Sequence, residues 1–200
     1  MRGHLYVLSG PSGVGKGTTL KEVLKKVSNL TFSTSVTNRI PRAGEIHGVD
    51  YYFVSDEEFE NLKKKNGFLE NVEKYGNKYG TPKFTIEQKL SSGVDVLLDI
   101  ETVGALKVKR SFPEAVLIFI TLRDMKKIEA RLRLRGTDTE EQIQERLSLK
   151  KKEYESIDEY DYIVENEDLN ECVEKVASII VADRCKIKNN LDLVKVIKEI

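Results

Sequence analysis

The chain has 200 residues, 40% of them hydrophobic, and its 33 basic residues balance its 33 acidic residues. This composition can fill one folded core, and the zero net charge argues against a protein that coats nucleic acid or an anionic membrane. No apolar run approaches the length of a membrane span, and a strand is predicted within the first few residues. We therefore expect no signal peptide and predict a cytoplasmic protein.

The first predicted elements are an apolar strand over residues 5–8, a glycine-rich loop, and a helix over residues 18–27. The loop nearly matches the phosphate-binding pattern G-x-x-x-x-G-K-[ST]. Glycines let backbone N–H groups turn inward around a polyphosphate, and the helix N-terminus adds its dipole. An ordinary glycine-rich turn is the alternative. The flanking strand and helix favour a polyphosphate site made of Gly10, Pro11, Ser12, Gly13, Val14, Gly15, Lys16, Gly17 and Thr18.

Buried strands and helices alternate along most of the chain. Nearly continuous apolar runs predict strands, and apolar residues three or four apart predict helices. The strands are expected near 94–100, 115–120 and 160–164, and the helices near 103–109, 125–132, 139–147 and 169–186. This order predicts an α/β fold with a parallel sheet covered on both faces.

The C-terminal segment carries two further expectations. Leu193, Ile197 and Ile200 predict a short amphipathic helix that packs on the body, with an oligomer contact as the alternative. Cys172 and Cys185 fit no common metal-binding spacing, and we interpret both as structural residues without a disulfide.

Residues 34–83 interrupt the alternation with short strands, glycines and two arginines, Arg39 and Arg42, on either side of Pro41. We interpret them as an inserted lobe over the C-terminal edge of the sheet, where α/β proteins bind ligands. Arginine forks match pairs of phosphate oxygens, and Tyr51 and Tyr79 can add hydroxyl donors. A single exposed arginine is more often part of a solvated ion pair, but two in one loop favour a second anion site.

From residue 5 to about residue 183 the chain resembles the guanylate kinases. The insertion is similar to the GMP-side motif of that family, in the pattern S-x-T-x-R-x-P-R-x-G-E-x-x-G-x-D-Y over residues 35–51. Shorter matches are Phe68-x-Glu70, Tyr79-Gly80-Thr81, the acidic strand end Asp99-Ile100-Glu101 with Gly104, the lid arginines Arg131, Arg135 and Arg146, and the adenine-side turn Asn166-x-x-Leu169.

The resemblance implies a parallel five-stranded P-loop sheet flanked by helices, with an inserted GMP-binding lobe and a helical lid. The implied core comprises residues 1–33, 84–125 and 151–200, the GMP-binding insertion residues 34–83, and the lid residues 126–150. The implied reaction transfers the terminal phosphoryl group of ATP to GMP with Mg²⁺ and yields ADP and GDP, as in the recycling of GMP. The partners would be these small molecules, with no nucleic acid or membrane; the sequence does not determine protein partners.

The resemblance also implies roles for individual residues. Lys16, Arg42, Arg131, Arg135 and Arg146 would be catalytic, and Asn166 would join the loop in binding ATP. GMP would be bound by Ser35, Arg39, Arg42, Glu45, Tyr51, Glu70, Tyr79, Thr81, Asp99 and Glu101. Within this set, Glu70 would accept hydrogen bonds from guanine, and Ser35 and Thr81 would donate to guanine O6.

Magnesium binding departs from the usual pattern because Gly17 stands where the loop normally has a metal-binding Ser or Thr. We expect phosphates and waters to hold most of the ion, with Asp99 in its outer shell and Thr18 as a further candidate.

Two other functions stay open from the sequence. A protein-binding scaffold module of this family typically lacks a working phosphate loop, whereas Gly10, Gly15 and Lys16 are present here. A kinase for another nucleoside monophosphate would not need a carboxylate such as Glu70 facing the base.

Overall fold

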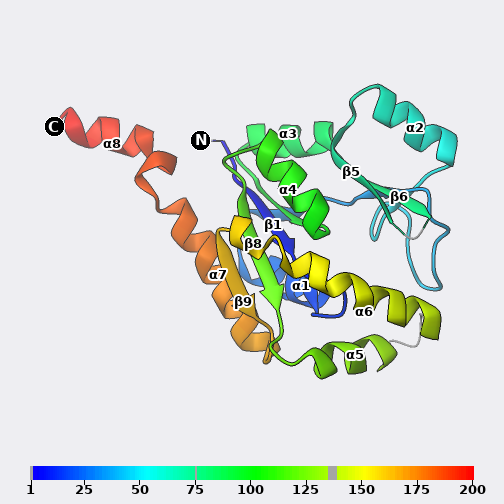
Figure 1. Ribbon diagram of the computed structural model, residues 1–200. Helices are drawn as coiled ribbons and strands as arrows, with labels where there is room; N and C mark the ends of the chain where they lie inside the picture. The colour runs from blue at the N-terminus through cyan, green and yellow to red at the C-terminus, as the bar shows by residue number, and fades with distance from the viewer. Residues whose placement is uncertain (1, 75, 135–138) are drawn as a thin grey trace.

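The computed structural model describes residues 2–74, 76–134 and 139–200 (Figure 1). Its centre is a five-stranded parallel sheet with the strand order β2-β7-β1-β8-β9. The strands are β1 (Leu5–Ser9), β2 (Leu30–Phe32), β7 (Asp95–Asp99), β8 (Val116–Thr121) and β9 (Tyr162–Glu165). The predicted fold class is confirmed. Strand β2 was not expected, because three half-buried residues carry no periodic signal.

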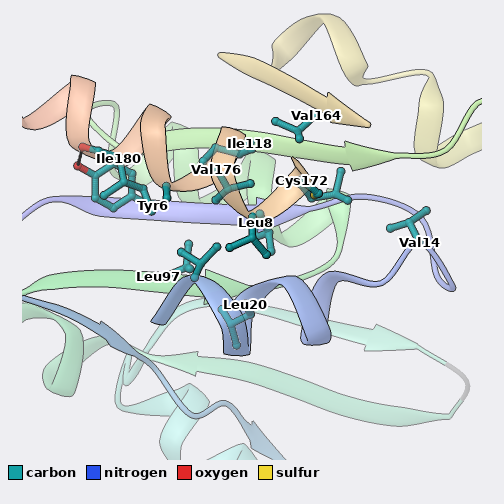
Figure 2. Packing of buried hydrophobic residues seen from close by; sticks show 14 of the residues in the cluster. Tyr6, Leu8, Val14, Leu20, Leu97, Ile118, Val164, Cys172, Val176 and Ile180 are labelled. Atoms are coloured by element: carbon teal, nitrogen blue, oxygen red, sulfur yellow. Dashed lines mark hydrogen bonds between the residues drawn. The ribbon is translucent and has the colours of Figure 1, made fainter. Parts of the chain in front are cut away.

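Side chains alternate across the central strand β1 and divide the core into two apolar clusters. Tyr6 and Leu8 belong to the cluster with α1 (Lys16–Lys26) and α7 (Leu169–Arg184), which Figure 2 shows. Leu5 and Val7 belong to the cluster with α3 (Lys83–Ser91) and α4 (Thr102–Ser111). Helices therefore cover both faces of the sheet. A ligand can bind only at the edge where the parallel strands end.

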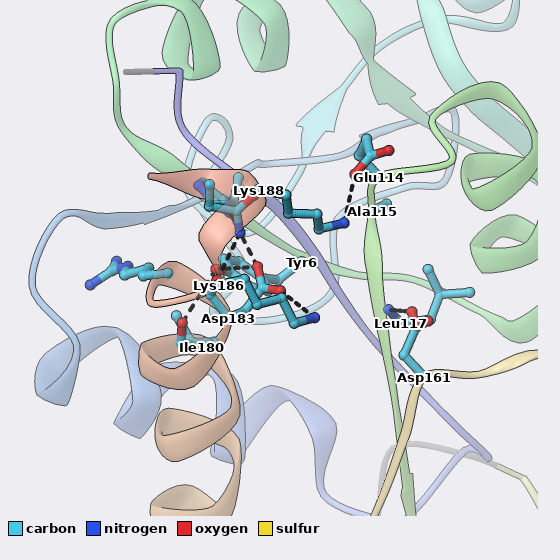
Figure 3. A network of polar contacts seen from close by, with 12 residues as sticks. Tyr6, Glu114, Ala115, Leu117, Asp161, Ile180, Asp183, Lys186 and Lys188 are labelled. Atoms are coloured by element: carbon cyan, nitrogen blue, oxygen red, sulfur yellow. Dashed lines mark hydrogen bonds and ion pairs between the residues drawn. The ribbon is translucent and has the colours of Figure 1, made fainter. Parts of the chain in front are cut away.

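A polar network ties the end of α7 to the start of β1 (Figure 3). The buried Asp183 carboxylate accepts a hydrogen bond from the Tyr6 hydroxyl at 3.2 Å and pairs with Lys186 at 2.8 Å. His4 Nδ1 lies 3.1 Å from the same carboxylate. The network joins the last long helix to the strand that leads into the phosphate loop.

A second, four-stranded sheet with the order β4-β3-β6-β5 lies within the insertion. Its strands are β3 (Val36–Thr37), β4 (Tyr52–Phe53), β5 (Phe68–Lys74) and β6 (Asn77–Pro82). Helix α2 (Asp56–Lys64) follows β4 and begins with a capping box, in which Ser55 and Glu58 satisfy each other's backbone N–H groups. Among the described residues of the insertion, Val36, Phe59 and Phe68 form a small buried apolar cluster between this sheet and α2.

Helices α5 (Met125–Leu134) and α6 (Glu140–Tyr154) lie side by side in the segment predicted as a lid (Figure 1). Ile128 and Leu132 are buried in the first core cluster, so α5 is attached to the core by its apolar face. A short 3-10 helix (Ile157–Glu159) then leads into β9.

The C-terminal tail does not pack as expected. After α7 comes a 3-10 turn (Ile187–Asn189) and then α8 (Leu191–Lys198), which projects away from the sheets (Figure 1). Val196 and Ile197 are each 59% exposed. The amphipathic helix was predicted correctly and its docking wrongly, because periodicity shows which face is apolar but not what covers that face.

The cysteines also differ from expectation. Both thiols are free, but only Cys172 is buried, whereas Cys185 is exposed at the end of α7. The structural interpretation therefore fails for Cys185. Within the described ranges, no helix has the length and apolar character needed to cross a membrane.

Candidate active site

The glycine-rich loop connects β1 to α1 at the C-terminal edge of the central sheet. Gly10, Gly13 and Gly15 have φ values of 139°, 90° and 96°, a region that favours glycine. A Cβ atom at Gly10 would lie 2.1 Å from the Ile120 carbonyl oxygen, and one at Gly15 would lie 2.5 Å from Asn166 Nδ2. The loop can keep this path only with glycine at these positions.

Two residues from distant segments of the chain donate hydrogen bonds to the backbone of the loop. The buried Asn166 side chain donates from Nδ2 to the Val14 carbonyl oxygen at 2.7 Å. Arg131 on α5 donates to the Val14 oxygen at 3.3 Å and to the Asn166 carbonyl oxygen at 3.2 Å. The loop is thus braced by Asn166, directly after β9, and by Arg131 on α5, and the predicted roles of both residues toward ATP stay predictions.

Lys16 begins α1 and extends back across the loop. Its Nζ donates to the Gly10 carbonyl oxygen at 2.7 Å and to that of Pro11 at 3.2 Å. An ammonium group has three donors, so a further donor remains for an anion at the loop. Thr18 is exposed, whereas Thr19 is buried and hydrogen-bonded to the Gly15 oxygen.

A cleft of about 290 Å³ separates the loop from the second sheet. Its lining combines three parts of the chain that are far apart in sequence. These are Ser12, Gly13, Gly15, Lys16 and Gly17 of the loop; Ser35, Arg39, Arg42, Glu45, Tyr51, Glu70, Val72 and Tyr79 of the insertion; and Asp99, Ile100 and Glu101 at the end of β7.

Most of the predicted site residues therefore meet at one cleft. The others lie elsewhere: Gly10, Pro11 and Val14 are buried in the loop, Thr18 is exposed, Thr81 is buried behind Glu70, and Asn166 and Arg131 brace the loop. Arg135 falls outside the described residues, as does the Arg146 side chain. The sequence reasoning missed Val72 and Ile100. Val72 follows Glu70 by two residues on β5, so the period of a strand could have identified it.

The two arginines of the insertion are organised by Glu45. Arg39 donates from one nitrogen to both Glu45 oxygens, at 2.7 and 2.9 Å, and lies over the Tyr51 ring at 5.4 Å. Glu45 also accepts from the Arg42 backbone N–H at 2.7 Å. The carboxylate therefore fixes the loop that presents both guanidinium groups to the cleft.

The buried Glu70 lies at the insertion side of the cleft and is only 5% exposed. The Thr81 hydroxyl donates to Glu70 Oε1 at 2.6 Å, while Oε2 has no hydrogen-bond partner among the described residues. Burial raises the pKa of Glu70 above its usual value, and the Thr81 hydrogen bond and the Lys107 charge oppose that rise. The single hydroxyl proton of Thr81 is used here, so the expected Thr81 donation to guanine O6 is not supported.

The tyrosines of the insertion stand close together beside the arginines. The Tyr51 and Tyr79 ring centroids are 6.0 Å apart, and both residues line the cleft. Burial, and then the negative charge of Asp99, raise the pKa of Tyr51 to about 12. Its hydroxyl therefore stays protonated at neutral pH and can donate to an anion.

Acidic residues at the end of β7 complete the cleft. Asp99 approaches the loop at Gly17, where a Cβ atom would lie 3.8 Å from Asp99 Oδ2. In the part of the chain that the structure describes, no group of three or more His, Cys, Asp or Glu side chains is arranged to hold a metal ion. A cation in this cleft would need ligands from a bound anion as well as from the protein.

Comparisons with known proteins agree with this geometry. The family model described as Guanylate kinase matches residues 2–183. A guanylate kinase of Desulfitobacterium hafniense (strain Y51) is 46% identical over 186 residues, which cover 93% of each protein. A guanylate kinase of Clostridium tetani (strain Massachusetts / E88) is 45% identical over 198 residues, which cover 99% of this chain and 95% of that protein.

Among solved structures, guanylate kinase from Anaplasma phagocytophilum superposes with a TM-score of 0.78 at 34% identity, covering 92% of this chain and 88% of the other. The family match spans the central sheet, the insertion and both helices α5 and α6. The chain belongs to the guanylate kinase family.

Proposed function

We propose that the chain transfers the terminal phosphoryl group of ATP to GMP, giving ADP and GDP. The observation that carries this proposal is the cleft itself. One wall is the phosphate loop with Lys16, the opposite wall presents Arg39 and Arg42, and the buried carboxylate of Glu70 lies on that second wall. Family membership supports the same reaction.

The chemistry requires charge neutralisation more than proton transfer. A phosphate monoester has a second pKa near 6, so GMP is already an adequate nucleophile at neutral pH and needs no general base. The cleft residues supply the other requirement, since Lys16 approaches the donor phosphates while Arg42 and Arg39 hold the acceptor phosphate. Catalysis then comes from alignment and from electrostatic stabilisation of the transferring group.

Guanine is distinguished from adenine by the hydrogen-bonding edge that meets Glu70. Guanine presents N1–H and an amino group side by side, which one carboxylate can accept together. Adenine has an unprotonated N1 at that position, which would leave the buried carboxylate without a donor. Ser35 is proposed to donate to guanine O6, and Glu101 to lie near the amino group.

Mg²⁺ fits the cleft only as a partner of bound phosphate. Asp99 is the carboxylate that approaches the loop, Gly17 offers no hydroxyl, and Thr18 is exposed. We propose that Asp99 contacts the ion through water and that phosphate oxygens supply its direct ligands. When bound, the ion would neutralise charge on the transferring phosphates.

We also propose that residues 34–83 and 126–150 close over the core formed by 1–33, 84–125 and 151–200. Closure would bring Arg131, Arg135 and Arg146 toward the transferring phosphoryl group and exclude water, which would otherwise hydrolyse ATP. The enzyme is proposed to work in the cytoplasm on diffusing nucleotides, without a nucleic-acid or membrane partner.

The deciding experiment measures ADP release from ATP and Mg²⁺ with GMP, dGMP, AMP, UMP or CMP as the acceptor. We expect GMP to give the highest kcat/KM, and product analysis should show GDP. ADP release that does not depend on any acceptor would indicate hydrolysis, and a higher kcat/KM for AMP, UMP or CMP would indicate a different monophosphate kinase.

A further inference from the structure

We propose that Gly104, on helix α4, is a positioning residue for base specificity. Because glycine has no side chain, space remains at this position for the Glu70 carboxylate to lie directly against α4 while Glu70 lines the cleft. This inference rests on the proposed function, because it takes Glu70 to be the residue that binds guanine.

The geometry of the contact is unusually close. Gly104 and Glu70 are 34 positions apart in sequence, yet a Cβ atom at Gly104 would lie 2.7 Å from Glu70 Oε2 and 3.1 Å from Glu70 Cδ. The next neighbour, Ile100 Cδ1, would be at an ordinary 3.6 Å. A side chain at position 104 would therefore conflict with the Glu70 carboxyl group alone among its near neighbours.

The surroundings of the Glu70 carboxyl group partly oppose the rise in its pKa that burial causes, and so help to keep the ionised form that guanine requires. Gly104 is the third residue of α4, so Glu70 lies at the positive, N-terminal end of that helix dipole. Thr81 fixes Oε1 at 2.6 Å, while the buried Oε2 lies against Gly104 and has no hydrogen-bond partner among the described residues. Lys107, one turn further along α4, adds positive charge and ties the helix to β5 through a 2.6 Å hydrogen bond to the Asn71 carbonyl oxygen.

Helix formation by itself does not explain a glycine at this position. Alanine is the better helix former, and the φ of Gly104 does not lie in the region that favours glycine. Close approach of the Glu70 carboxylate is the remaining physical reason for glycine here.

The test is Gly104→Ala, with steady-state kinetics for GMP, AMP and ATP. The fold should persist because the atoms that must move are the end of one flexible side chain, and thermal unfolding will verify this. Displacing the carboxylate should lower kcat/KM for GMP at least about tenfold, mainly through KM, while the KM for ATP changes less than about twofold. The GMP/AMP ratio of kcat/KM should fall with it.

Val103→Ala is the matched control, because Val103 is 55% exposed on the same helical turn and receives the same new residue. A double-mutant cycle with Glu70→Ala then tests the route of the effect. If Gly104 acts through Glu70, adding Gly104→Ala to Glu70→Ala should leave the GMP/AMP ratio unchanged.

The outcomes separate the two proposals. A wild-type enzyme without a preference for GMP would remove the proposed function. A GMP preference that survives Gly104→Ala, or that falls by the same factor with and without Glu70, would overturn the role of Gly104 while leaving the proposed function in place.

Discussion

The wall of the cleft that carries the phosphate loop rests on two large apolar clusters, whereas the wall formed by the insertion encloses three buried apolar residues. The first wall is attached to parallel strands with helices on both faces. The second is held in addition by surface ion pairs such as Lys78 to Asp56, in which the Asp56 side chain is 64% exposed. Exposed ion pairs contribute little stability each, so the acceptor wall should deform at a lower free-energy cost than the donor wall.

This difference suits a kinase that must admit two anions and then exclude water. A rigid loop keeps the backbone N–H groups directed at one polyphosphate. Donors that had to reorganise during the reaction would raise the activation barrier and lower the rate. A deformable acceptor wall can open for a nucleotide and close over it. The following predictions test whether the two walls differ in this way.

The largest effect is expected at the rigid wall, from Lys16→Met. Removing the ammonium group that stabilises developing charge should lower kcat by roughly a hundredfold or more. The thermal midpoint should be close to that of wild type, because the hydrogen bonds of Lys16 to described residues are those to two loop carbonyl oxygens. A folded variant that retains more than about a tenth of the wild-type kcat would contradict this role.

Truncating one buried side chain in each wall should separate global from local stability. Leu97→Ala, in the first core cluster, should lower the free energy of unfolding by about 2–5 kcal/mol in urea denaturation.

Phe59→Ala removes one of two aromatic rings whose centroids are 4.7 Å apart in the insertion. Hydrogen exchange should then accelerate in β5 and β6 but not in β1. Equal acceleration in all three strands would show that the two walls unfold as one unit.

Arg42→Ala should affect one substrate more than the other. Because Arg42 lines the acceptor side of the cleft, its loss should raise the KM for GMP by about tenfold or more and that for ATP much less. Arg110→Ala, an exposed arginine in the last turn of α4, is the control and should change neither value. Equal increases for both substrates would mean that the insertion is not a separate acceptor wall.

The smallest effect is a pH dependence of GMP binding. Burial raises the pKa of Glu70 above its ordinary value of 4.5, so the buried carboxyl group gains a proton at a higher pH than an exposed one. Only the ionised form accepts both guanine donors, so the KM for GMP should rise as the pH falls through that raised pKa. Glu70→Gln cannot titrate and should keep only the dependence that comes from the GMP phosphate.

The same pKa shift has an opposite consequence for stability. A carboxyl group whose pKa is higher in the folded protein stabilises the fold below its unfolded pKa and loses that contribution as the pH rises through the folded pKa. Unfolding measurements on wild type and Glu70→Gln should therefore diverge from about pH 4.5 upward, with wild type losing stability relative to the variant. Parallel curves would indicate that Glu70 titrates normally.

The sequence by itself determined the features that depend on neighbouring residues. Apolar runs and helical spacing predicted the long strands and helices of the core. The glycine loop was identified because a phosphate site of this type needs strand, loop and helix in succession. These signals are local, since a short stretch of chain limits its own backbone angles and chooses which face is apolar.

Only the tertiary structure decided which distant residues meet. The Asn166 side chain braces a loop residue 152 positions away, Thr81 donates its proton to Glu70 and not to the cleft, and α8 projects where docking was expected. The crowding between Gly104 and Glu70 is of the same kind. Such contacts depend on how strands pair and helices pack, and no short segment encodes the distance between two parts of the chain that fold against each other.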